Sequence, residues 1–144
     1  HIFYRAGPSK PMEQLLDAAR EAVGNAHTPY SGYGVGAALE TSNGLVYTGC
    51  NVEVANYSNS LHAEEVALGT AVGEGHRSFD RLAVVSGERD GVTPCGMCRQ
   101  TLAEFCSPGF EIACGSRDGV RTYRLGELLP EPISAAHLDT EGEQ

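Results

Sequence analysis

The sequence predicts an α/β fold, a three-layer αβα sandwich in which helices cover both faces of a mixed five-stranded sheet. An amphipathic helical segment opens the chain, and a hairpin signal follows it. Beyond the hairpin, short apolar segments alternate with helical ones. Strand–helix–strand order gives parallel strands and the hairpin adds an antiparallel pair, so the sheet should be mixed.

The first helix is expected over residues 12–23. Its charged residues fall mostly off a stripe of apolar side chains at helical spacing. Pro11 before the helix and Gly24 after it are typical of helix boundaries. The stripe consists of Leu15, Leu16, Ala19, Ala22 and Val23.

A hairpin is expected next. Residues 35–40 and 45–50 have the character of two short strands, and Asn43-Gly44 lies in the turn between them. Asn-Gly accepts the positive φ angles of a type I′ turn, which joins antiparallel strands.

The second half of the chain supplies the alternation of strands and helices. The apolar run at 82–85 is typical of a buried central strand. Residues 1–10 are expected to form an N-terminal arm, and residues 139–144 a disordered acidic tail. The other expected elements are a helix over 62–72, a helix that begins at Thr93-Pro94 and ends near 106, strands over 110–114 and 120–124, and a short helix over 125–129.

Length and composition indicate one globular domain over residues 1–144. Hydrophobic residues make up 41% of the chain and charged residues 20%, an ordinary globular balance. The net charge of −9 argues against the basic surface that nucleic-acid binding needs. No apolar run approaches the roughly 20 residues of a membrane span, so no membrane partner is expected.

Five cysteines are an odd number, and the N-terminus has no signal-peptide pattern. This combination favours reduced thiols and a cytoplasmic location. Two of the cysteines, Cys95 and Cys98, form a Cys-x-x-Cys pair, whose usual role is either metal binding or redox chemistry.

The segments with the most chemical content are His62-Ala63-Glu64 and Pro94-Cys95-Gly96-Met97-Cys98. A catalytic zinc site typically has three protein ligands and a position open to water, and His62, Cys95 and Cys98 supply such a set. Both cysteines lie at an expected helix start, where the helix dipole favours the thiolates that zinc requires. His62 lies at another helix start, so two helix N-termini should point at one metal ion.

Glu64 has the chemistry of a general acid and base. By resemblance to zinc-dependent deaminases, a zinc-activated hydroxide would add to the amidine carbon of a cytosine-type ring, and Glu64 would carry protons to the ring nitrogen and the leaving amine. Residues i and i+2 of a regular helix do not face each other, so His62 must lie at the cap or first turn to share a site with Glu64. His-x-Glu followed by Pro-Cys-x-x-Cys is also the signature of zinc-dependent deaminases.

Other roles for these residues are open. The Cys-x-x-Cys segment alone would fit a redox pair, although Pro94 precedes the pair instead of lying within it. A structural zinc normally has four protein ligands, and no fourth is evident, since the cysteines at 50, 106 and 114 have the character of small core residues. A non-enzymatic zinc-binding module would also have no need for Glu64.

The chain resembles the short, single-domain form of the cytidine deaminase family over residues 29–138. The resemblance implies a cytidine deaminase-like fold, a Zn²⁺ cofactor, and deamination of cytidine and deoxycytidine to uridine and deoxyuridine plus ammonia, as in pyrimidine salvage. It also implies a homotetramer whose subunits share active sites. The motifs that carry it are Pro29-Tyr30-Ser31, Val35-Gly36-Ala37-Ala38, Thr48-Gly49-Cys50-Asn51-Val52-Glu53, His62-Ala63-Glu64, Pro94-Cys95-Gly96-Met97-Cys98-Arg99-Gln100 and Glu127-Leu128-Leu129-Pro130.

The resemblance further implies contacts with the substrate. Asn51 and Glu53 would hydrogen-bond the ribose hydroxyls, and the backbone of Ala63 would contact the base. Tyr33 matches an aromatic residue, usually Phe, next to the substrate. Tyr57 matches a tyrosine that reaches the sugar site of a neighbouring subunit. Taken in isolation, Asn51 would more often cap a turn and Tyr57 would more often be a packing residue.

Three residues depart from the family pattern. Short members usually carry Cys in place of His62 and Arg in place of Glu65. One neutral His with two thiolates leaves a zinc site of zero net charge, so we hypothesise that His62 removes the need for that Arg. Ile133 replaces a Phe that stacks on the base from another subunit, and it can offer apolar contact but no stacking.

The first functional interpretation is therefore an aminohydrolase for cytidine or deoxycytidine. The alternative is an aminohydrolase for a cytosine nucleoside antibiotic, of the blasticidin-S deaminase type, because residues 66–71 resemble that enzyme. Against the alternative, Asn51-Val52-Glu53 keeps the ribose-binding pattern. An RNA- or DNA-editing deaminase is disfavoured by the net charge of −9 and by the lack of basic or aromatic patches.

Overall fold

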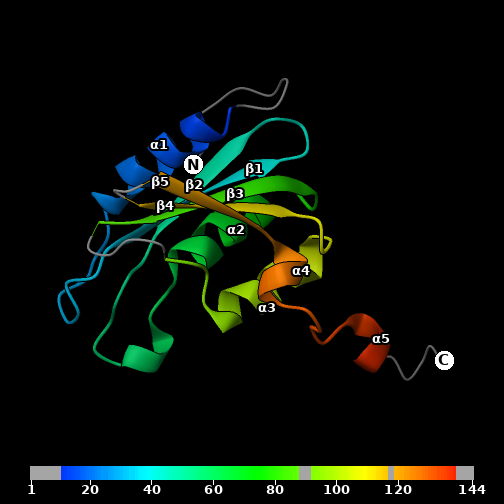
Figure 1. Ribbon diagram of the computed structural model, residues 1–144. Helices are drawn as coiled ribbons and strands as arrows, with labels where there is room; N and C mark the ends of the chain where they lie inside the picture. The colour runs from blue at the N-terminus through cyan, green and yellow to red at the C-terminus, as the bar shows by residue number, and fades with distance from the viewer. Residues whose placement is uncertain (1–10, 88–91, 117–118, 139–144) are drawn as a thin grey trace.

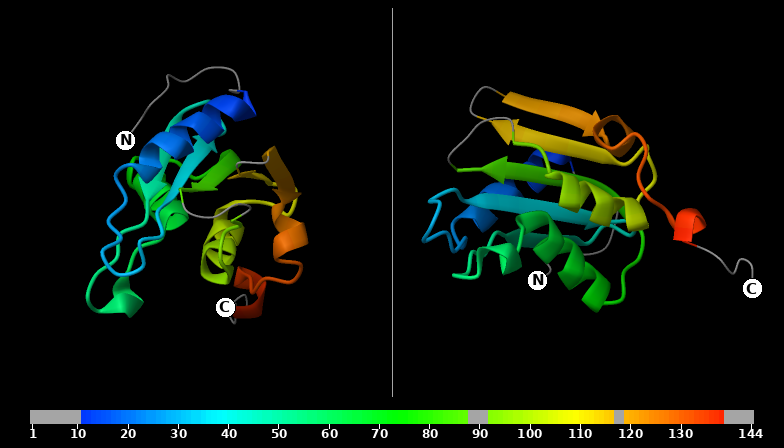
Figure 2. Two further views of the ribbon diagram at one scale, coloured as in Figure 1. Left: turned by 60° about the vertical axis from the view of Figure 1, so that its left-hand side comes forward. Right: turned by 90° about the horizontal axis from the view of Figure 1, so that it is seen from below.

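A computed structural model describes residues 11–87, 92–116 and 119–138. Five strands form one sheet in the order β2-β1-β3-β4-β5, with α1 on one face and α2 and α3 on the other (Figures 1 and 2). The predicted three-layer sandwich with a mixed sheet is confirmed. The strands are β1 (Val35–Thr41), β2 (Val46–Cys50), β3 (Phe79–Ser86), β4 (Glu111–Ser116) and β5 (Gly119–Arg124), and the helices are α1 (Met12–Val23), η1 (Tyr57–Asn59), α2 (Ala63–Gly73), α3 (Gly96–Phe105), α4 (Leu125–Leu128) and α5 (Ala135–Leu138).

Strand β3 is the centre of the sheet. It pairs antiparallel with β1 and parallel with β4, while β2 and β5 form the antiparallel edges. Helices cover both of its faces, which explains why the run Leu82–Val85 is apolar without alternation. The prediction of a buried central strand is confirmed.

Successive side chains along each strand point to opposite faces of the sheet, so they belong to two separate cores. Ala38 and Ala83 point to α1, where they meet the apolar stripe predicted for that helix. Leu39 and Leu82 point to the opposite face and pack with residues of α2 and α3. The sheet is therefore a rigid platform between two helix layers, and α2 and α3 share one of its faces.

The hairpin between β1 and β2 is confirmed, but its turn is not the predicted type I′. Asn43 does not adopt a positive φ, whereas Gly44 has φ 88°. The Thr41 N–H donates to the Leu45 carbonyl at 2.8 Å, which leaves a loop of three residues. Such a loop needs only one left-handed residue. The Thr41 hydroxyl favours it further, because it accepts the Leu45 N–H at 3.0 Å.

Helix α3 begins two residues later than predicted. Cys95, not Thr93, is the N-cap residue, with φ −70° and ψ 170°. The carbonyl of Pro94 accepts a hydrogen bond from Arg99 Nε at 2.7 Å, so Pro94 stays in the preceding extended segment. The shift places the Cys95 side chain at the helix entrance.

Two short elements, η1 and α5, were not predicted, because single turns leave no periodic pattern. The expected arm at 1–10 and tail at 139–144 lie outside the described residues. Among the residues that the structure describes, no helix has the length and apolar content to span a membrane.

Tyr47 on β2 offers a test of the core. Its side chain is fully buried against His76, and its hydroxyl has no hydrogen-bond partner within the described part of the chain. An unsatisfied buried hydroxyl costs about 1–3 kcal/mol. Tyr47→Phe should therefore raise the free energy of unfolding by about 1 kcal/mol, measured by urea denaturation. A loss of stability would show that the hydroxyl is hydrogen-bonded in solution.

Candidate active site

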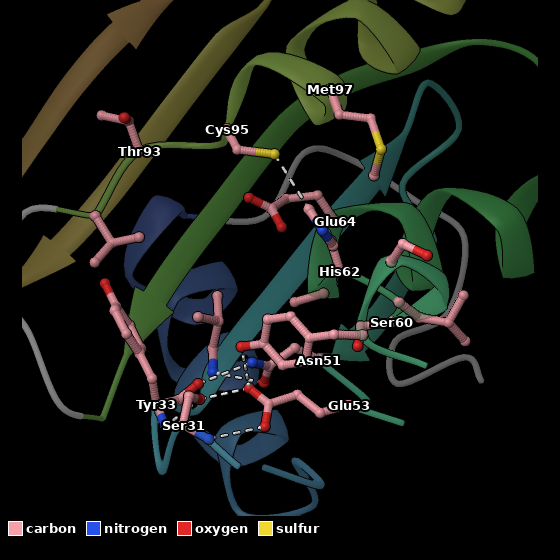
Figure 3. Close-up of a pocket in the computed structure, with 16 residues that line it drawn as sticks. Ser31, Tyr33, Asn51, Glu53, Ser60, His62, Glu64, Thr93, Cys95 and Met97 are labelled. Carbon is pink, nitrogen blue, oxygen red and sulfur yellow. Dashed lines mark hydrogen bonds between the residues drawn. The ribbon is translucent and has the colours of Figure 1, made fainter. Parts of the chain in front are cut away.

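A cavity of about 460 Å³ lies where α2 and α3 begin (Figure 3). Its size suits a small-molecule ligand. It brings together residues that are far apart in the sequence but that the motifs had singled out. These are Tyr33, Asn51, Glu53, Tyr57, His62, Ala63, Glu64 and Cys95.

The three predicted metal ligands converge on one point. His62 Nδ1 lies 3.2 Å from Cys95 Sγ and 3.5 Å from Cys98 Sγ. All three ligand atoms lie within 4.8 Å of one another, and no other such group occurs within the described ranges. His62 caps α2 and Cys95 caps α3. Two helix N-termini therefore meet at this point, as the sequence predicts.

The cap position of His62 explains how it shares a site with Glu64. Its backbone is extended, with φ −94° and ψ 150°, so the i, i+2 rule of a regular helix does not apply. The carboxylate of Glu65 accepts the backbone N–H of His62 at 2.7 Å. This is half of a capping box, and it holds the entrance of α2 in place. Glu65 thus has a structural role that the sequence did not reveal.

Arg99 holds the segment that precedes α3. Its guanidinium donates to the Pro94 carbonyl at 2.7 Å and to the Thr93 hydroxyl at 3.0 Å. It also donates to the carbonyl of Leu128 in α4 at 2.8 Å. Arg99 therefore fixes the approach to Cys95. Its place directly after the Cys-x-x-Cys pair was the only signal in the sequence.

The electrostatics of this end of the cavity fit a cation. Glu64 is 6% exposed, and burial raises its pKa, an effect that the neighbouring His62 and Cys98 partly offset. Burial also raises the pKa of Cys98, and the charges of Glu64 and Cys95 raise it further. A thiolate at Cys98 therefore needs a positive charge beside it. Two sulfurs and one imidazole nitrogen suit Zn²⁺.

The other end of the cavity is polar. Asn51 Oδ1 accepts the Val35 N–H at 2.9 Å, and Asn51 Nδ2 donates to the Tyr33 carbonyl at 2.8 Å. The side chain of Asn51 thus joins the loop before β1 to the end of β2, as an amide in a structural role would. One amide N–H of the side chain remains for a ligand.

Glu53 accepts hydrogen bonds from the Ser31 hydroxyl, from the backbone N–H groups of Ser31 and Tyr30, and from the Tyr57 hydroxyl. The bond from the Ser31 hydroxyl is the main reason that the pKa of Glu53 lies below its usual range despite burial. The carboxylate is therefore ionised at neutral pH. Sequence reasoning had given no role to Ser31.

Ile133 does not line this cavity. It is 54% exposed, and its backbone is held by the side-chain amide of Gln100, which donates at 2.9 Å and accepts at 3.3 Å. A contact of Ile133 with the base would require another subunit, as the resemblance implies, and stays a prediction.

Comparison with known proteins now identifies the family. Residues 9–114 match the model of the cytidine and deoxycytidylate deaminase zinc-binding region. The chain belongs to the cytidine deaminase family. The matched region contains His62, Cys95 and Cys98, so the family and the donor set agree on zinc as the metal of this site.

Relatives of this deaminase match over most of their length. A cytidine deaminase of Sporosarcina psychrophila is 39% identical over 92% of this chain and 98% of its own. The crystal structure of cytidine deaminase from Burkholderia pseudomallei is 38% identical, with a TM-score of 0.81 over 86% of this chain and all of that one. The structure from Mycobacterium tuberculosis is 34% identical, with a TM-score of 0.76 over 87% of this chain and 98% of that one.

Proposed function

We propose that this protein is a zinc-dependent aminohydrolase that converts cytidine and deoxycytidine to uridine and deoxyuridine plus ammonia. The observation that supports this most directly is the buried carboxylate of Glu64 beside the three zinc ligands, in a cavity whose other end carries Asn51 and Glu53. A metal in a purely structural role needs no acid–base group beside it.

The reaction needs a nucleophile and a proton carrier. His62, Cys95 and Cys98 would hold the zinc ion, which when bound would supply the nucleophile by lowering the pKa of a water molecule to about 7. Glu64 accepts the proton of the attacking water. It then passes that proton to the ring nitrogen of the base, takes a second proton from the hydroxyl that has added to the ring carbon, and delivers it to the amine, which leaves as ammonia. Burial suits Glu64 to this work, because it raises the pKa of the carboxyl and so lets it hold a proton more readily than an exposed carboxyl does.

The polar end of the cavity would recognise the sugar of the substrate. Glu53 and Asn51 would hydrogen-bond the hydroxyls of the sugar, and Tyr33 lies beside them on the cavity wall. The backbone of Ala63, between the metal ligand and the acid–base residue, would contact the base. The relatives compared above are named cytidine deaminases, which favours cytidine over a cytosine nucleoside antibiotic such as blasticidin S.

The exposed side chains around the cavity favour an assembly of several subunits. Tyr57, Leu61 and Met97 line its wall, yet they are 57%, 46% and 50% exposed. Large apolar side chains in such a cluster favour contact with another chain. We propose the homotetramer with shared sites that the resemblance implies, and size-exclusion chromatography with light scattering tests it.

An absorbance assay tests the function. The purified protein should contain one zinc per chain and should deaminate cytidine and deoxycytidine, with little turnover of cytosine or blasticidin S. Chelation of the metal should abolish turnover, and added Zn²⁺ should restore it. Preferred turnover of blasticidin S would support the antibiotic aminohydrolase, and a zinc-loaded protein that deaminates none of the four would contradict a deaminase.

A further inference from the structure

Glu53 organises the end of the cavity opposite Cys95 (Figure 3). Its carboxylate is 5% exposed. Oε1 accepts the backbone N–H groups of Tyr30 and Ser31, both at 3.1 Å. Oε2 accepts the Ser31 hydroxyl at 2.5 Å and the Tyr57 hydroxyl at 3.3 Å. A carboxylate offers about four acceptor positions, so all of them are occupied within one chain.

The direction of the Ser31 hydroxyl bond follows from its neighbours. Ser31 Oγ accepts the backbone N–H of Tyr33 at 2.9 Å. A hydroxyl has only one proton, and an ionised carboxylate can only accept. The Ser31 proton therefore points at Glu53 Oε2. Through this one oxygen atom, Ser31 fixes the carboxylate of Glu53 relative to the backbone of Tyr33.

The two donors on Oε2 differ in how readily a ligand can replace them. The bond from Tyr57 is longer than the usual O–H···O distance of about 2.5–3.0 Å, and Tyr57 is 57% exposed. Ser31 forms the short bond and is bound to Glu53 through its backbone as well. A sugar hydroxyl can therefore take the place of Tyr57 on Oε2 while Ser31 remains.

We propose that Ser31 is a positioning residue that determines how strongly the enzyme recognises the secondary hydroxyls of the substrate's sugar. It holds Glu53 so that one acceptor position of Oε2 faces the cavity. Without its hydroxyl, the carboxylate keeps its charge but loses its shortest bond, and it presents that position less well. The chemistry at Glu64 is unaffected. This inference rests on the proposed function, because it assigns part of the nucleoside site.

The test compares kcat/KM for cytidine and for 2′,3′-dideoxycytidine, which lacks both secondary hydroxyls. Wild type should prefer cytidine. Ser31→Ala should lower that preference about tenfold through a higher KM for cytidine, because a hydrogen bond to a charged group is weakened. Its kcat should stay within about twofold of wild type, since the acid–base group is untouched. Ser31→Thr retains the hydroxyl and should restore most of the preference.

A matched control separates this effect from a general loosening of the loop. The loop that carries Ser31 ends at Gly34, whose carbonyl accepts the Ser86 hydroxyl at 3.0 Å. Ser86 itself does not line the cavity. Ser86→Ala should leave the preference for cytidine unchanged. Where Ser31→Ala fails to fold, Ser31→Cys keeps the size with a weak donor and should show the same loss.

Three outcomes would overturn the role of Ser31. They are an equal loss on both nucleosides, a loss confined to kcat, and an equal effect of Ser86→Ala. A wild type that deaminates both nucleosides without preference would also overturn it, while leaving the deaminase in place. A wild type that deaminates neither nucleoside overturns the proposed function itself, and the role of Ser31 with it.

Discussion

Glu64→Gln should reduce kcat for cytidine by about 10³-fold, because proton transfer by a positioned side chain contributes about 10²–10⁴-fold. Gln has the size and polarity of Glu but cannot accept or release the proton. The zinc content should be unchanged, because Glu64 is not among the proposed metal ligands His62, Cys95 and Cys98. Steady-state kinetics combined with elemental analysis measures both quantities.

The stability of this variant provides a second measurement. Burial makes the pKa of Glu64 higher in the folded chain than in the unfolded one. A carboxyl of this kind binds its proton more tightly when folded, so stability falls as the pH rises above the unfolded pKa. Gln has no such dependence. The zinc-free variant should therefore be at least as stable as the zinc-free wild type at pH 7.

Glu65→Gln is the matched control, since it makes the same chemical change one residue along. Gln can also accept the His62 N–H in a capping box, so both the cap and kcat should be largely retained. Substantial turnover by Glu64→Gln would show that the proton travels by another route. Loss of zinc from that variant would show that Glu64 supports the metal site.

Gly49→Ala, a substitution on strand β2, should lower activity by displacing helix α2. A Cβ at Gly49 would lie 2.3 Å from the carbonyl oxygen of Ala63 and 2.6 Å from the backbone nitrogen of Ala67. Both atoms belong to the α2 backbone and cannot rotate away, so the helix must move. Overpacking of this kind costs about 1–3 kcal/mol. Because α2 carries Glu64 and its cap is His62, kcat should also fall, by up to about 10²-fold for a shift near 1 Å.

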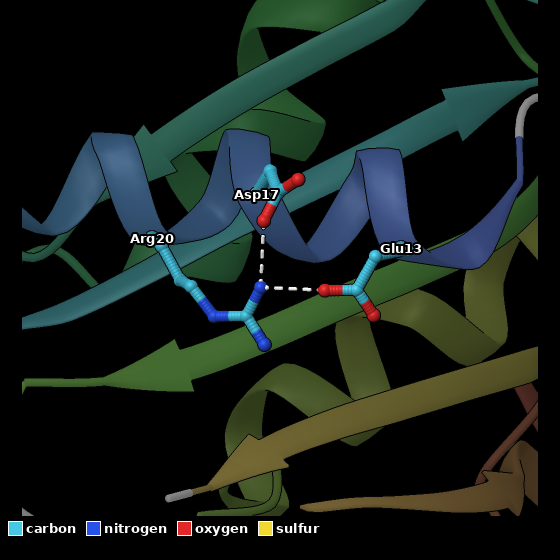
Figure 4. A network of polar contacts seen from close by, with 3 residues as sticks. All are labelled: Glu13, Asp17 and Arg20. Carbon is cyan, nitrogen blue, oxygen red and sulfur yellow. Dashed lines mark hydrogen bonds and ion pairs between the residues drawn. The ribbon is translucent and has the colours of Figure 1, made fainter.

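Gly36→Ala is the control on the opposite face. Its Cβ would lie 2.1 Å from the Ala19 carbonyl of α1, a helix that contributes no site residue. Arg20 of the same helix pairs with Glu13 and Asp17 (Figure 4), and all three residues belong to α1 and not to the site.

Gly36→Ala should lose stability as Gly49→Ala does, but its folded fraction should retain kcat and zinc. Urea unfolding, with kcat corrected for the fraction folded, compares the two variants. Equal kcat in both would mean that the contact at Gly49 does not set the position of α2.

Much of the fold followed from patterns along the chain. The stripe of α1, the apolar run of β3 and the hairpin signal each depend on neighbours within a few residues, so the sequence predicts them. The turn type at Asn43-Gly44 and the start of α3 were wrong. In each case a side-chain hydrogen bond favours the observed structure. The Thr41 hydroxyl accepts the Leu45 N–H in the turn, and Arg99 donates to the Pro94 carbonyl before α3.

The candidate site divides in the same way. The sequence by itself determined which residues are the candidate zinc ligands and that Glu64 is the candidate acid–base group, because donor type and order along the chain are sequence properties. Only the tertiary structure showed that Cys95 occupies the N-cap of α3, and that the Ser31 hydroxyl donates to Glu53. Contacts of this kind depend on where two distant backbone segments lie relative to each other. Packing of those segments against the sheet sets that position.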